Sequence, residues 1–121
     1  YAQALSILYG MLEGISRTLN IEREDISGCI EWYWDEAVQN NSFGFVFYDK
    51  TPGGAGHVRR IQDQTVLENV LHNTLELMQR CTCGGEAMDT SCYGCLRNYY
   101  NQKFHDVLQR GHVVRFLQEI L

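Results

Sequence analysis

Two close pairs of cysteines constrain this chain more than any other feature of its sequence. Cys81 and Cys83 form one pair, Cys92 and Cys95 form the other, and all four lie within 15 consecutive residues. Four soft thiolates that converge on one point are typical of a tetrahedral zinc site. Such a site leaves no open position for water or substrate, so we expect one structural Zn²⁺ rather than a catalytic one. One spacing departs from the common pattern, because a single residue separates Cys81 from Cys83.

Disulfide bonds and redox-active thiols are two other chemistries that suit paired cysteines. The fifth cysteine, Cys29, makes the total odd. An odd total suits a reducing compartment better than a disulfide framework, and we therefore expect a cytoplasmic protein. We expect Cys29 to be a core residue, since free cysteines behave as small apolar side chains.

The length of 121 residues, 45% of them apolar, predicts a single domain over residues 1–121 with a substantial core. The chain starts at Tyr1 inside a helical pattern and lacks an initiator methionine, so we expect a C-terminal fragment of a larger protein. No run of 18 apolar residues occurs, and we expect no membrane span.

The formal net charge is −5, whereas an independent duplex-binding module is normally basic. The charge is distributed unevenly along the chain. Residues 1–79 carry 11 acidic and 5 basic side chains, and residues 80–121 carry 4 acidic and 5 basic ones. If any surface contacts nucleic acid, the end with the paired cysteines is therefore the better candidate.

Apolar periodicity predicts an α+β chain. We expect helices over residues 2–19 and 58–80, the second broken near residues 62–64, because apolar side chains recur at three- and four-residue steps. Alternation predicts strands over residues 26–34 and 43–48, joined as an antiparallel hairpin by a longish polar loop. We expect a helix or a tight turn over residues 96–102 and a helix end at Arg110-Gly111. A last helix is expected from Val113 onward.

The aromatic residues of the first strand have two interpretations. Trp32 and Trp34 share one face of the strand and could stack on nucleic-acid bases. Aromatic side chains on strands are more often part of the core, which is the interpretation we favour.

The glycine-rich segment Gly53-Gly54-Ala55-Gly56 follows a strand and precedes a helix, where such turns can bind phosphate. It lacks the Gly-Lys-Ser/Thr of a P-loop and the last glycine of a dinucleotide motif, so a sharp structural turn is favoured. Asp49 and His57 flank it and could form an acid/base pair, although nothing in the spacing supplies a nucleophile.

Basic side chains and histidines follow the cysteines. Arg97, Lys103 and Arg110 could form a basic patch, but we expect a solvated face. His105 and His112 could contribute to a second metal site. We do not favour this interpretation, because four cysteines already complete one tetrahedral zinc site.

Several motifs in order are specific enough to suggest a family. Residues 47–57 read FYDKTPGGAGH, residues 81–83 read CTC, residues 91–99 read SCYGCLRNY and residues 101–105 read NQKFH. Together, from about Leu19 to Arg110, they resemble the MrfA-type zinc-binding domain. That domain is found at the C-terminus of DEAD/DEAH-box superfamily 2 helicases and in anti-phage defence proteins of the DISARM type.

The resemblance implies that Cys81, Cys83, Cys92 and Cys95 bind zinc. It also implies an accessory role in an ATP-dependent, DNA-translocating helicase of DNA repair or phage restriction. The chain itself contains no Walker lysine, DEAD/DEAH box or arginine finger, so we expect no enzymatic activity from it. The resemblance leaves open whether the domain touches DNA.

We therefore predict an α+β domain with a helix-rich body, a small antiparallel β-hairpin and a four-cysteine zinc knuckle. The first functional hypothesis is a zinc-stabilised accessory domain that braces the helicase motor of the parent chain and contacts DNA. The second is a protein–protein interaction module of a defence or repair complex without nucleic-acid contact. The third is a small enzyme that works at Asp49 and His57.

Overall fold

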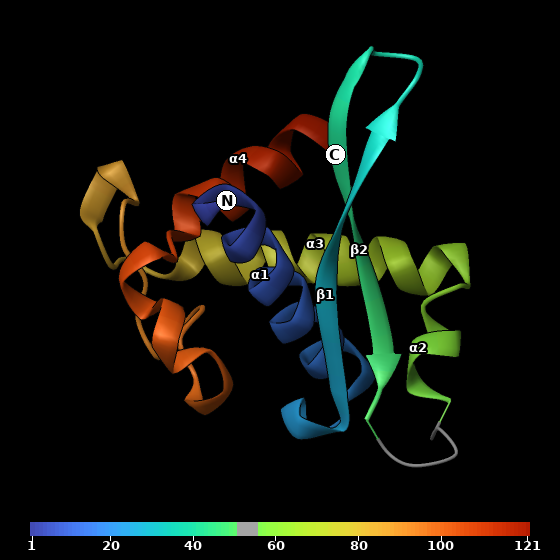
Figure 1. The fold of residues 1–121 in the computed structure, drawn as a ribbon. Coiled ribbons are helices and arrows are strands. Elements are labelled where there is room, and N and C mark those ends of the chain that lie inside the picture. Colours follow the sequence, from blue (N-terminus) through green and yellow to red (C-terminus); the bar gives the residue numbers. More distant parts are fainter. Residues whose placement is uncertain (51–55) are drawn as a thin grey trace.

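The computed structural model describes residues 1–50 and 56–121 (Figure 1). Its α-helices and strands are α1 (Ala2–Leu19), β1 (Ile26–Asp35), β2 (Asn40–Asp49), α2 (His57–Arg60), α3 (Gln64–Arg80) and α4 (Arg110–Ile120). Short 3-10 helices η1 (Arg23–Asp25), η2 (Gly85–Ala87) and η3 (Tyr99–Val107) connect them. The predicted α+β class, a helix-rich body with one antiparallel hairpin, is confirmed.

Helix α1 is the centre of the packing, because it contacts α3, α4 and β1. Its apolar face is almost entirely buried, as the three- and four-residue spacing predicts. The helix ends where Asn20 takes the left-handed conformation (φ 56°, ψ 52°) and its N–H bonds back to Arg17. Figure 1 shows α3 crossing behind both α1 and the hairpin. The two helices approach closely at Gly14, where an added Cβ would overlap the hydroxyl of Thr74.

The hairpin is longer and its loop is tighter than the sequence predicts. Strands β1 and β2 pair antiparallel over ten residues each, in a register that sets Ile26 opposite Asp49 and Trp32 opposite Phe43. The predicted loop over residues 35–42 is wrong, since the strands continue to Asp35 and from Asn40. The Asp35 carboxylate accepts the N–H of Ala37 and helps to close a short turn. The polar residues 40–42, which follow this turn, therefore pair with β1 as part of β2.

Helices cover only the half of the hairpin that contains Ile26 and Ile30. Ile26 is fully buried and Ile30 partly buried, but Trp32 and Trp34 are 54% and 52% exposed. The expected core role of the two tryptophans is therefore wrong, because the hairpin projects beyond the helical body (Figure 1). Cys29 is also exposed, contrary to expectation, because it lies on the face of β1 that alternates with the covered one.

The strand-to-helix connection is organised by Asp49. Its two carboxylate oxygens accept the backbone N–H groups of Gly56 (3.2 Å) and Val58 (3.1 Å), so they bind the start of α2. This structural use of the carboxylate gives no support to the acid/base pair with His57. Residues Gly53, Gly54 and Ala55 lie outside the described residues, and the role of the glycine-rich turn stays a prediction.

The predicted break between two helical segments is confirmed at residues 61–63. Asp63 caps α3, because its carboxylate accepts the N–H groups of Thr65 and Val66. The predicted helix end at Arg110-Gly111 is wrong, since these residues form the first turn of α4. None of the helices in residues 1–50 and 56–121 is long and apolar enough to cross a membrane.

Candidate metal centre

The structure brings the four predicted cysteine ligands together at the end of α3. Their Sγ atoms all lie within 4.8 Å of one another. Cys81 lies 3.4 Å from both Cys83 and Cys92, and Cys95 lies 3.8 Å from Cys83 and 3.9 Å from Cys92. In the described part of the chain, no other cluster of histidine, cysteine or acidic side chains has metal-binding geometry.

These separations fit one tetrahedral metal ion. Four sulfurs at the zinc–sulfur distance of about 2.3 Å stand about 3.8 Å apart along each edge of the tetrahedron. The observed separations bracket that value, so little movement is needed to close the four thiolates around an ion. All five cysteines of the chain are free thiols in the structure, which gives the disulfide alternative no support.

Two tight turns deliver the two cysteine pairs. Cys81 ends α3 in an extended conformation, and the chain then turns at Gly84, whose φ of +75° favours glycine. The second pair lies in a turn in which the Cys92 carbonyl accepts the N–H groups of Cys95 (3.1 Å) and Arg97 (2.9 Å). Residues 96–102 are predicted to form a helix or a tight turn, and the structure has this turn followed by the 3-10 helix η3.

The sulfurs accept backbone hydrogen bonds and are partly desolvated. The N–H of Gly94 points at Cys92 Sγ (3.3 Å), and the N–H of Cys92 points at Cys95 Sγ (3.4 Å). Burial raises the pKa of both Cys83 and Cys95. Burial also acts on Cys81, but the N–H of Cys83 and bonds to the other thiols outweigh it and lower its pKa to about 7. A central divalent cation would stabilise all four thiolates against this desolvation.

The centre is attached directly to the hydrophobic core. Cys95 is only 2% exposed, and the next residue, Leu96, is fully buried. Both belong to a core cluster with the end of α3 and the inner face of α4; its other members are Leu5, Met78, Leu108, Val113, Val114 and Leu117. A metal ion held by these four cysteines would therefore stabilise a packed cluster and not only a surface loop.

Arg110 is the most important residue of the site that the sequence did not predict. It is 4% exposed, and its guanidinium donates to the carbonyls of Met78 (2.9 Å), Cys83 (2.9 Å) and Gly85 (3.1 Å). The Met78 carbonyl lies in the last turn of α3, where a cation is favoured by the helix dipole. The arginine therefore connects α4 to the helix end and the loop that carry the first cysteine pair. The expectation that it belongs to a solvated face is wrong.

The first turn of α4 is also fixed by its backbone. The N–H of Arg110 bonds to the carbonyl of Thr90, and the N–H of Gly111 bonds to the carbonyl of Met88, each at 2.9 Å. A Cβ on Gly111 would lie 2.8 Å from the same Met88 oxygen, so glycine allows this approach. The segment between the cysteine pairs is thus held on both sides by α4.

The segment after the second pair is joined to α1. Asn98 caps η3 and its amide donates to the carboxylate of Glu13 (2.9 Å). Asn101 is fully buried and donates to the Leu96 carbonyl (2.7 Å), while His105 contacts the Asn101 side chain. His105 is thus used in a protein network, and the proposed second metal site with His112 finds no support among the described residues.

The three basic residues singled out in the sequence do not form one patch. Arg110 is buried against carbonyls, Arg97 donates to the Ser91 hydroxyl (2.9 Å), and the ammonium of Lys103 lies over the Phe104 ring. A different pair of arginines, Arg17 and Arg80, lines a surface groove of about 380 Å³ that reaches Cys81 and Gly94. The sequence did not indicate this pair, because its members lie on different helices.

Comparison with known proteins agrees with this geometry. The family model of the MrfA Zn-binding domain matches residues 7–96. The chain is also similar to the Druantia protein DruE of Escherichia coli (strain UMEA 4076-1), with 36% identity over 63 residues. That alignment covers 52% of this chain and only 3% of the relative. No solved structure matches.

Proposed function

The chain belongs to the family of MrfA Zn-binding domains, and from that premise we propose that Cys81, Cys83, Cys92 and Cys95 hold one structural zinc ion. The observation that carries the proposal is the convergence of four Sγ atoms within 4.8 Å. A zinc ion with four protein ligands has no place for a substrate, so its role here is to hold the end of α3, the loop and the turn together.

We further propose that this domain is an accessory part of a larger helicase-like protein that acts in DNA repair or anti-phage defence. The family and the similarity to the Druantia protein support this context. The aligned residues make up only 3% of that relative, so the whole-protein activity belongs to other parts of such a chain. In this arrangement, the zinc-stabilised body gives the motor domains a rigid surface to rest on.

Metal analysis tests the zinc assignment directly. The chain is purified without added metal, and elemental analysis is combined with a thiol count on the folded protein under native, non-chelating conditions. One zinc and one reactive thiol per chain are expected, and Cys29→Ser is expected to remove the thiol without changing the zinc. Absence of metal together with four oxidised thiols would refute the assignment.

The surface that suits DNA best is the groove beside the metal centre. Arg17 and Arg80 both line it, with exposed fractions of 55% and 72% for their side chains. Each forms a salt bridge with a glutamate one turn earlier on its own helix, Arg17 with Glu13 at 3.6 Å and Arg80 with Glu76 at 3.5 Å. Such pairs contribute about 0.3–0.5 kcal/mol, so either arginine can turn to a phosphate.

Salt-dependent binding of a single-stranded oligonucleotide tests whether this groove contacts DNA. The double variant Arg17→Gln/Arg80→Gln is expected to lower the slope of log K against log salt by about 1.4, because two phosphate contacts are lost. Arg59→Gln, an exposed arginine on α2, serves as the matched control. A slope that the double variant leaves unchanged would remove DNA contact at this groove.

The second candidate is a protein–protein interaction module without nucleic-acid contact. The acidic balance of residues 1–79 and the exposed aromatic residues of the hairpin favour it. Absence of any salt-dependent oligonucleotide binding by the zinc-loaded chain would decide for this candidate over the first.

A further inference from the structure

We propose that the projecting half of the β1–β2 hairpin is a docking surface for a basic segment of another protein. The surface consists of the exposed side chains Trp32 and Trp34 and the half-buried Phe43, together with the groove beside Trp32. It lies away from the metal centre, and it gives the protein–protein interaction module, the second candidate function, a specific surface and partner chemistry.

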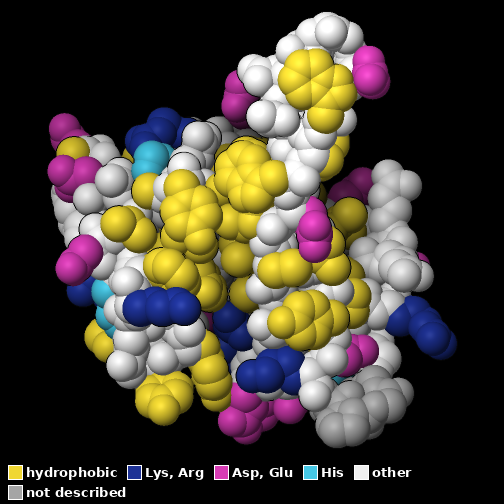
Figure 2. Space-filling model, in the orientation of Figure 1, with side chains coloured by type: hydrophobic (Ala, Val, Ile, Leu, Met, Phe, Trp, Pro, Cys, Tyr) yellow, Lys and Arg dark blue, Asp and Glu magenta, His cyan; other side chains and the backbone are white. Residues whose placement is uncertain are grey.

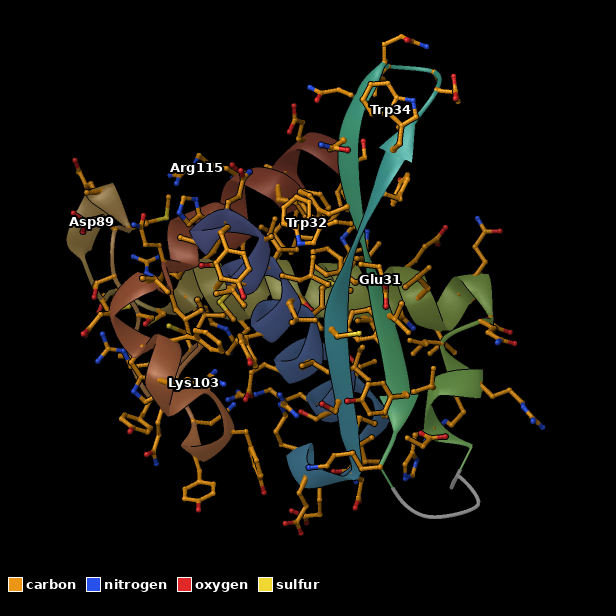
Figure 3. All side chains as sticks on the ribbon, in the orientation of Figure 1. Glu31, Trp32, Trp34, Asp89, Lys103 and Arg115 are labelled. Carbon is orange, nitrogen blue, oxygen red and sulfur yellow. The ribbon has the colours of Figure 1, made fainter. Side chains whose placement is uncertain are left out.

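The aromatic side chains form a continuous row that passes from the core to the exposed end. Phe47 and Phe45 lie against the α1 core, Phe45 meets Phe43 edge to face (centroids 5.5 Å), and Phe43 meets Trp32 (5.2 Å). Figure 3 shows Trp32 near the helical body and Trp34 near the projecting end, with Glu31 on the other side of β1. Tryptophans in such exposed rows are frequent energetic centres of protein interfaces.

A groove of about 290 Å³ continues this row onto the helical body. It is lined by uncharged side chains, among them Leu5, Leu8, Tyr9, Ile30 and Trp32. Figure 2 shows hydrophobic side chains gathered where the hairpin meets the helices. The groove has room for one apolar side chain of a partner, placed next to the indole of Trp32.

The charge of the hairpin specifies what else the partner carries. Residues 26–49 contain four acidic side chains and no lysine, arginine or histidine. Glu31, Asp35 and Glu36 form no salt bridge within the part of the chain that the structure describes. Figure 2 shows acidic groups on both sides of the aromatic group at the projecting end. Indole faces beside carboxylates favour arginine and lysine through cation–π and ionic attraction.

The same charges exclude the base-stacking interpretation of Trp32 and Trp34. A nucleic acid would bring phosphates toward a hairpin with four acidic side chains and no basic one, and like charges repel. Lys103 lies over the ring of Phe104, which is one of the residues that line the groove. The partner therefore places an apolar residue in the groove and its arginine or lysine over the tryptophans.

Titration of the zinc-loaded chain followed by the two indole N–H signals tests this inference. The probe is a synthetic peptide of alternating leucine and arginine, and its counterpart carries glutamate at every arginine position. Only the arginine peptide is expected to shift both indole signals, in a manner that weakens with salt. A single-stranded oligonucleotide is expected to leave them unchanged.

Variants locate the surface. Trp34→Ala is expected to weaken peptide binding about tenfold, whereas Tyr33→Ala, equally exposed on the opposite face, is expected to change it less than about twofold. Glu31→Gln/Asp35→Asn/Glu36→Gln is expected to remove most of the salt dependence. Zinc content and circular dichroism verify that each variant is folded. Four results overturn the inference: no indole response, equal response to the glutamate peptide, a response to the oligonucleotide, or concentration-dependent shifts from self-association.

Discussion

Replacement of Arg110 by methionine should destabilise the domain by about 3 kcal/mol, because the guanidinium satisfies three carbonyls around the metal centre. The Met78 carbonyl is buried and loses its partner completely, whereas the Cys83 and Gly85 carbonyls are partly accessible to water. One orphaned buried acceptor contributes about 1–3 kcal/mol, and each of the accessible ones contributes about 0.5–1 kcal/mol. Methionine keeps most of the buried aliphatic volume, so packing loss adds little.

Urea unfolding of the zinc-loaded protein, followed by circular dichroism, measures this loss. Competition with a chromophoric chelator measures zinc affinity, which we expect to fall about 10- to 100-fold, because partners that orient metal ligands have effects of that size. Arg115→Met is the matched control, since Arg115 lies on the same helix and is exposed. If Arg110→Met is no more destabilising than this control, Arg110 does not hold the site together.

Two further substitutions test other parts of the fold. Cys92→Ser should lower zinc content below one per chain and loosen the C-terminal helices, because three ligands hold the ion less well; unchanged zinc and melting temperature would contradict the site. Gly14→Ala should destabilise by about 1–3 kcal/mol, because its Cβ would overlap the Thr74 hydroxyl. Gly44→Ala, whose Cβ meets only Tyr33 at 3.9 Å, is the control, and equal melting of the two variants would show that α1 and α3 can separate without loss.

The sequence predicted the parts of this protein that depend on local patterns. Helical periodicity placed α1 to within a residue, with Asn20 as its end, and alternation placed the hairpin. The paired cysteines indicated the site, because their short spacing forces them close together whatever the rest of the chain does. The geometry of the four sulfurs then follows from two turns that the glycine at position 84 and the Cys92 carbonyl make possible.

The parts that the sequence did not predict depend on long-range contacts. Arg110 lies 27 residues from Cys83, and an arginine before a glycine resembles an exposed helix end in sequence alone. Trp32 and Trp34 alternate with polar residues as core residues of a strand do. The neighbouring sequence does not show that α1 covers the sheet only between Ile26 and Trp32 and leaves the rest exposed. In both cases, the environment of a side chain is set by how far a distant helix extends.

The two core clusters predict where the effect of metal removal stops. The first cluster contains Cys95 and the inner face of α4. The second joins α1 to β1 and α3 and contains Leu12, Ile15, Ile26 and Val70, and no cysteine is among its members or the side chains packed against it. Loss of the ion leaves partly buried thiols unsupported and should release α4 and the end of α3 first, since local openings follow contiguous units. In hydrogen exchange of the chelator-treated protein, the backbone amides of α4 should therefore lose protection, while those of β1 and β2 near Ile26 keep it. Simultaneous loss in both regions would show that the metal and the whole fold form one cooperative unit.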